Sequence, residues 1–135
     1  MNRGADDTAL IARVRAVMMD AVIRKTGVLH HTVRAGVGEW EQVAPGVQRK
    51  LLWERDVAAS CMLRLAPGTT FPSHTHQIDE ECLVLEGSLQ IGRDLVLKQG
   101  DFHVGLGGVE HESVSTTDGC LCFLRTARCF FEPAA

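Results

Sequence analysis

The chain has 135 residues, of which 45% are hydrophobic and 23% charged, and its formal net charge at pH 7 is −3. This length suits one domain with a real core, and the composition lacks the basic excess expected of a nucleic-acid-binding protein. The first thirty residues contain Asp6 and Asp7 and no long apolar run, so we expect neither a secretory signal nor a membrane span. We therefore predict a cytoplasmic protein that binds neither nucleic acid nor a membrane.

An amphipathic helix is expected from Thr8 to Lys25, and it should end at Gly27, a residue that tolerates the left-handed conformation at helix ends. Its apolar residues recur at helical spacing while most charged residues fall elsewhere. The apolar positions are Leu10, Val14, Val17, Met18 and Ala21. We assign residues 1–27 to an N-terminal helical arm.

From residue 28 onward, short β-type runs alternate with turn signals such as Pro45-Gly46 and Gly107-Gly108. The spacing is typical of an antiparallel sandwich or barrel, and no βαβ alternation is present. The expected strands are Val28–Arg34, Val47–Trp53, Val57–Leu65, Glu81–Leu85, Asp94–Lys98, Phe102–Val104, and Cys120–Phe131 with a break. We assign residues 28–135 to one all-β domain.

Several of these strands have two apolar faces. Leu83 and Leu85 alternate with Cys82 and Val84, although a free sheet needs to bury only one face. The second face calls for a partner sheet, the N-terminal helix or a second subunit. We predict a homodimer.

The five cysteines fit a reducing compartment, because they are odd in number and lie mostly in apolar strand-like runs. They are Cys61, Cys82, Cys120, Cys122 and Cys129. Cys120 and Cys122 share one strand face, which allows a redox pair or soft metal ligands, but we favour two ordinary core thiols.

The densest group of potential metal ligands lies in the stretch PSHTHQIDEECLVLEG, residues 72–87. His74 and His76 point the same way if this is strand, and Glu80 follows after a bend. His111, in GVEHESVS, is the best candidate for a further ligand from a neighbouring strand. Imidazole and carboxylate donors suit zinc, iron, manganese, nickel or copper.

These two segments resemble the motifs of the cupin superfamily. Gly68, His74, His76, Glu80 and Gly87 match every fixed position of the first motif, G-x5-H-x-H-x3-E-x6-G. Gly100, Gly108 and His111 match the second, G-x5-P-x-G-x2-H-x3-N, in which Leu106 and Ser115 replace the usual Pro and Asn. The resemblance implies a cupin-type jelly-roll β-barrel with an N-terminal α-helix. It also implies that His74, His76, Glu80 and His111 bind one divalent metal ion, with zinc as the first candidate and iron, manganese or nickel as alternatives.

A narrower resemblance covers most of the chain. The segments TVRAGVGEWEQVAPGVQRKLLWERD, LRLAPGTTFPSHTHQIDEECLVLEGSL and GDFHVGLGGVEHES are similar to the cupin domain of ChrR-type anti-sigma factors and its stand-alone relatives. In the full-length anti-sigma proteins a separate zinc-binding helical domain holds the sigma factor. Residues 8–25 resemble at most the linker helix ahead of the cupin, so sigma-factor binding is not carried over.

This resemblance implies a metal-binding domain of regulatory or sensor type. The alternative is a metal-dependent dioxygenase or related oxidoreductase acting on a small carbonyl or dicarbonyl compound, because related stand-alone cupins cleave β-diketones. Either function implies a small-molecule ligand or substrate.

Five further side chains near the expected ligands also have expected positions or roles. Glu81 should face outward and not bind the metal, because it alternates with Glu80. His103 can line the cavity and move a proton, but we favour a structural role. In an enzyme, Met62, Phe71 and Phe102 are expected to supply an apolar wall.

Overall fold

The structure is a computed structural model that describes residues 10–20, 30–128 and 130–131. The chain divides into two compact units, Met1–Val37 with Pro133–Ala135, and Gly38–Glu132. In the first unit residues 10–20 are helical, as predicted, and the ends of the predicted Thr8–Lys25 helix lie outside the described residues. Among the described residues, no helix has the length and apolar character needed to cross a membrane.

The predicted strand over Val28–Arg34 is wrong where it can be compared, because residues 30–34 form no strand. The first strand is β1 (Glu41–Ala44), which was not predicted and pairs with β2 (Val47–Arg55). A residue's preference for strands depends largely on packing against a neighbouring strand, which the local sequence of β1 does not reveal. The turn at Pro45-Gly46 places β1 beside β2. Glu41 lies opposite Arg49, and Arg49 Nε donates a hydrogen bond to Glu41 Oε1 at 2.8 Å.

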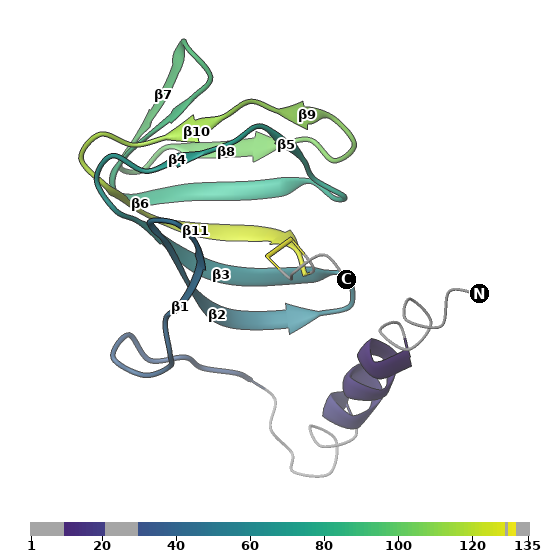
Figure 1. The fold of residues 1–135 in the computed structure, drawn as a ribbon. Helices are drawn as coiled ribbons and strands as arrows, with labels where there is room; N and C mark the ends of the chain where they lie inside the picture. The colour runs from purple at the N-terminus through teal and green to yellow at the C-terminus, as the bar shows by residue number, and fades with distance from the viewer. Residues whose placement is uncertain (1–9, 21–29, 129, 132–135) are drawn as a thin grey trace. The chain divides into compact units, whose positions relative to one another are not determined.

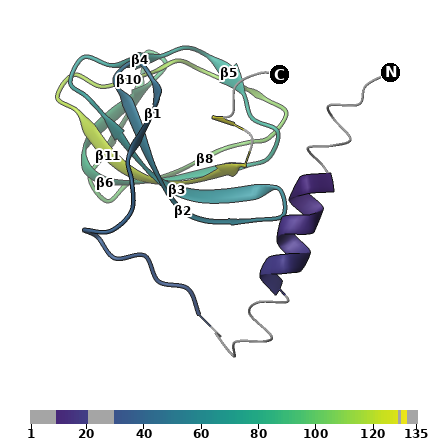
Figure 2. The same cartoon turned by 60° about the horizontal axis from the view of Figure 1, so that its bottom comes forward.

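The second unit is a jelly-roll β-barrel made of a curled antiparallel sheet (Figures 1 and 2). The sheet has the order β1-β2-β3-β11-β6-β10-β4, with β7 and β8 also paired to β6, while β5 and β9 form a separate pair. The remaining strands are β3 (Ala58–Leu65), β4 (Thr70–Phe71), β5 (His74–Thr75), β6 (Glu80–Ile91), β7 (Leu95–Lys98), β8 (Phe102–Gly105), β9 (Glu110–His111), β10 (Val114–Ser115) and β11 (Cys120–Ala127).

Strand β6 crosses from one half of the barrel to the other. Its first residues pair with β8 and its last residues pair with β7 and β10. Gly87 lies between these halves with φ +74°, and a Cβ there would stand 2.1 Å from the carbonyl oxygen of Gly119. Only glycine fits this position without moving the backbone, which explains the last glycine of the first motif.

The barrel interior is filled by alternate residues of the central strands. The core comprises Val47, Cys61, Leu63, Leu65, Cys82, Val84, Leu89, Ile91, Leu97, Cys120, Cys122 and Leu124. Cys120 and Cys122 are therefore core thiols, as predicted, and Cys129 lies outside the described residues. Burial raises the pKa of the Cys61 thiol to about 12, against a partial opposing effect of Arg49, so this thiol stays protonated and unreactive at neutral pH.

Candidate metal site

Strands β5 and β9 bring the two sequence motifs together. In their antiparallel pair, His74 lies directly opposite His111. The adjoining loops are joined by two further hydrogen bonds, from Gly108 N to the His76 carbonyl oxygen at 2.8 Å and from Gly107 N to Asp79 Oδ1 at 2.9 Å. Asp79 therefore has a structural partner in the second motif.

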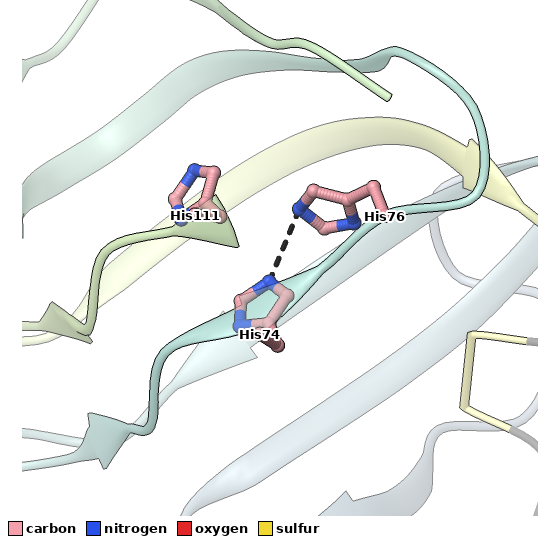
Figure 3. Close-up of side chains that lie close together, drawn as sticks. All are labelled: His74, His76 and His111. Atoms are coloured by element: carbon pink, nitrogen blue, oxygen red, sulfur yellow. Dashed lines mark hydrogen bonds between the residues drawn. The ribbon is translucent and has the colours of Figure 1, made fainter. Parts of the chain in front are cut away.

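Three imidazoles converge at this junction (Figure 3). One ring nitrogen from each of His74, His76 and His111 lies within 4.8 Å of the others, and this is the one such group found among the described residues. Nε2 of His74 is 3.1 Å from Nε2 of His76. His76 is only 1% exposed, so the cluster reaches into the barrel interior.

Hydrogen bonds to the backbone place the lone pairs of His74 and His111 on their inner ring nitrogens, which can bind a cation. Nδ1 of His74 is 2.8 Å from the Pro72 carbonyl oxygen, and Nδ1 of His111 is 2.8 Å from the Glu112 carbonyl oxygen. A carbonyl oxygen only accepts, so each Nδ1 carries the hydrogen and each Nε2 keeps its lone pair. Metal-binding histidines commonly have this arrangement.

The electrostatic environment favours the neutral form of the His74 and His103 imidazoles. Desolvation lowers the pKa of His74, against a hydrogen bond to Pro72 that raises it, and His76 and His111 lower it further. Desolvation, followed by the influence of His111, lowers the pKa of His103. Neutral imidazole is the form that binds a metal ion.

Glu80 stands next to the cluster, on the far side of the His76 ring. Its Oε2 is 3.2 Å from Nδ1 of His76, while the nitrogens that converge on one another belong to the three histidines. Glu80 is 9% exposed, and within the described part of the chain its Oε2 has no hydrogen-bond partner. Nδ1 of His76, the polar atom beside it, is likewise buried without a hydrogen-bond partner among the described residues, and two unsatisfied buried atoms fit a site completed by a cation better than they fit an empty core. As expected, Glu81 faces the other side of β6 and is opposite Arg125.

Gly105 is a site residue that the sequence analysis missed. It ends β8, and a Cβ at this position would lie 2.7 Å from Cδ2 of His111 and 3.7 Å from Cδ2 of His76. The absence of a side chain leaves room for both rings. No spacing rule distinguishes Gly105 from the turn glycines around it, so its role cannot be inferred from the sequence alone.

A cavity of about 60 Å³ adjoins the cluster, enough for a few water molecules or a small ligand. Phe71 lines it, as predicted, but Met62 and Phe102 do not. Phe102 is 60% exposed, because it alternates with the inward-facing His103 in β8. His103 lines the cavity with its ring centroid 5.8 Å from that of His111, and its role stays a prediction. The other lining residues are Val47, Leu63, Leu65, His74, Glu80, Cys82, Leu89, Ile91, His111, Val114, Cys122, Leu124, Phe130 and Phe131.

A jelly-roll barrel with histidines from two motifs clustered inside it is the architecture of a cupin. The sequence profile of the ChrR Cupin-like domain matches residues 29–129, which is most of the chain. The chain therefore belongs to the ChrR cupin-like domain family. Among curated proteins, none matches it.

Solved structures with the same fold include proteins of different kinds. The structure of Rhodobacter sphaeroides SigE in complex with the anti-sigma ChrR matches with 24% identity and a TM-score of 0.60, over 69% of this chain and 50% of the matching chain. KdgF from a Halomonas species matches with 20% identity and a TM-score of 0.62, over 73% of this chain and 94% of the other. An acetylacetone dioxygenase from Acinetobacter johnsonii matches with 14% identity and a TM-score of 0.59, over 73% and 76%. These likenesses establish the fold, and the chain spans half the length of the ChrR-complex chain that it matches.

Proposed function

We propose that this protein is a metal-binding cupin of regulatory or sensor type, with one divalent cation held by His74, His76, Glu80 and His111. The observation that carries this proposal is the convergence of three imidazole nitrogens within 4.8 Å, two of them with their other nitrogen held by a backbone carbonyl. Three histidines and one carboxylate can complete a tetrahedral zinc site from the protein alone.

Glu80 enters the proposed ligand set on chemical grounds. Its buried Oε2 has no hydrogen-bond donor in the described chain, and it adjoins the His76 ring. A rotation of the carboxylate toward the cluster would replace the missing donor with a cation. If Glu80 instead stays at Nδ1 of His76, it orients that ring and increases its basicity. Both arrangements predict that Glu80 strengthens metal binding.

The cavity favours a second candidate, a metal-dependent dioxygenase or related oxidoreductase. Iron or manganese accepts more ligands than zinc, so the same residues would leave positions for a small carbonyl compound in the apolar space beside the cluster. The metal would supply the activation of the substrate. The barrel wall, including Phe71, would orient the substrate and exclude water.

We also propose that the protein forms a homodimer through the outer face of the barrel. Phe102, Leu83, Phe123 and Met62 lie directly opposite one another across β8, β6, β11 and β3, on the face turned away from the core. Phe102 is 60% exposed and Val104 beside it 39%. A continuous apolar row of this kind is typical of a surface that another protein covers. Sedimentation of the full chain at micromolar concentration as a monomer would contradict this part of the proposal.

Elemental analysis of protein purified without added metal tests the proposed function. We expect close to one metal ion per chain, and His76→Ala should reduce the content well below that value. Zinc without activity supports the regulator, and iron with oxygen consumption on a β-diketone supports the enzyme. If wild-type protein holds no metal even after dialysis against zinc or iron salts, both functions are wrong.

A further inference from the structure

Two aromatic side chains follow β11, and the first of them packs against the histidine cluster. The ring centroid of Phe130 is 4.9 Å from that of His76, 5.0 Å from that of His74 and 6.0 Å from that of Phe71. The Phe131 ring packs on the Phe130 ring, with centroids 4.6 Å apart. Both phenylalanines line the cavity beside the cluster. The two rings therefore occupy space that a ligand beside the histidines would need.

Phe130 lies beyond the paired part of β11. The β11 ladder to β3 and β6 ends by Ala127. Beyond it, Arg128 N donates to the Val57 carbonyl oxygen at 2.8 Å, and Phe130 N donates to the Ala127 carbonyl oxygen at 3.0 Å. The first bond ties the end of β11 to the segment between β2 and β3, and the second closes a turn; displacing Phe130 costs only the second bond and its ring contacts. Turn segments held in this way open more easily than paired strands.

The side chain of Arg49 packs over Phe131, the outer ring of the aromatic pair. The guanidinium carbon of Arg49 lies 5.5 Å from the centroid of Phe131, and Arg49 is itself paired with Glu41 of β1. A guanidinium over an aromatic face stabilises the contact, more so where water is excluded. The aromatic pair thus has a defined closed position, held from β2 on one side and from the histidines on the other.

We propose that Phe130 is a movable cap over the histidine cluster, and that the ligand of this site is a small, largely apolar molecule with an oxygen donor that takes the place of the ring. The apolar cavity wall selects for such a molecule, and the cap limits its size. Ligand binding and the closed position of Phe130 exclude each other. In a sensor, displacement of this segment would be the structural change that reports the ligand. The identity of the ligand rests on the proposed metal site, while the closure of the histidines by Phe130 does not.

The first experiment uses metal-free protein in a chelator and therefore tests the cap alone. Diethyl pyrocarbonate acylates neutral imidazole nitrogens, and peptide mass spectrometry gives the rate at each histidine. In Phe130→Ala we expect His76 to react about tenfold faster than in wild type, the factor that corresponds to 1.4 kcal/mol of lost ring contacts. His30, which is exposed, is the internal reference.

Trp40→Ala is the matched control, because it removes an aromatic ring that packs on Arg64 and does not line the cavity. Its His76 should react at the wild-type rate. If Phe130→Ala fails to fold, Phe130→Leu replaces it, with a smaller acceleration expected. An unchanged His76 rate in the folded variant, or an equal acceleration in Trp40→Ala, would refute the proposal that Phe130 covers His76.

The second experiment uses cobalt-loaded protein and acetylacetone as the probe, followed by the visible spectrum of Co²⁺. Acetylacetone should bind about tenfold more tightly to Phe130→Ala than to wild type, and equally to Trp40→Ala and wild type. Weaker binding to Phe130→Ala would show that the ring is part of the binding wall and would refute displacement. If cobalt does not bind to any of these proteins, the proposed function is wrong, and the acylation rates still decide whether Phe130 closes the cluster.

Discussion

Replacing Glu80 by Gln should have opposite effects on the metal-free and metal-loaded protein. In the metal-free protein a carboxylate that is 9% exposed has an Oε2 without a hydrogen-bond partner in the described chain. A buried charge without a partner costs more than a neutral polar group, so Glu80→Gln, which removes the charge, should raise the free energy of unfolding by about 1–3 kcal/mol.

In the metal-loaded protein the same change should weaken metal binding. A residue that only orients a ligand contributes about 10–100-fold to affinity, and loss of a direct charged ligand costs more, so at least a tenfold decrease is expected. Urea unfolding in the presence of a chelator measures the first effect, and competition with a chromophoric chelator measures the second. Glu81→Gln is the control on the outer face of the same strand, where stability should change by less than about 0.5 kcal/mol and metal affinity not at all. A metal-free Glu80→Gln protein that is less stable than wild type, or one with undiminished metal affinity, would refute this reasoning.

Gly87→Ala should destabilise the protein by about 2–4 kcal/mol in urea unfolding, because the backbone there has φ +74° and the added Cβ would lie 2.1 Å from the Gly119 carbonyl oxygen. Gly100→Ala is the control. Its φ is +89° and no atom lies within 4 Å of the added Cβ, so it should destabilise the protein by only about 1 kcal/mol. Equal losses in the two variants would count against the close approach. Because the folded protein raises the pKa of Cys61 from 9.0 to about 12, its contribution to stability is complete below pH 9 and falls by about 1.4 kcal/mol per pH unit between pH 9 and pH 12. Cys61→Ala should lack this part of the slope, and identical slopes would show that the thiol does not ionise differently on unfolding. His76→Ala should lower the melting temperature of protein purified with its metal, since binding energy is coupled to folding, and an unchanged melting temperature would exclude that coupling.

The fold was largely predictable because its strands carry strong local signals. The alternation of apolar residues placed β3 and β11 to within a few residues, and the parity of Glu80 correctly put that side chain on the buried face of β6. The two-residue strands β5 and β9 were not predicted, because two residues are too short for a periodic pattern, and their pairing is set by contacts far apart in sequence. The resemblance to the cupin motifs supplied the proximity of His74 and His111 that local reasoning could not.

The surroundings of the site were much less predictable. The sequence predicts a last strand over Cys120–Phe131 with a break, which includes Phe130. Its contact with His76 depends on a turn after Ala127, and that turn contains no Gly or Pro signal. Phe102 does not line the cavity, because successive side chains of β8 point to opposite faces and His103 is the one that points inward. Residues that contact the histidines from distant segments can be identified only once the barrel is closed.

The central claim is that the imidazoles of the two motifs bind one cation together. Anomalous diffraction from crystals of the full chain, collected at the absorption edge of the metal found by elemental analysis, tests this claim most directly. We predict one strong anomalous peak per chain, within about 2.0–2.3 Å of Nε2 of His74, His76 and His111. A peak elsewhere in the chain, or none between the three rings in protein that contains stoichiometric metal, would contradict it.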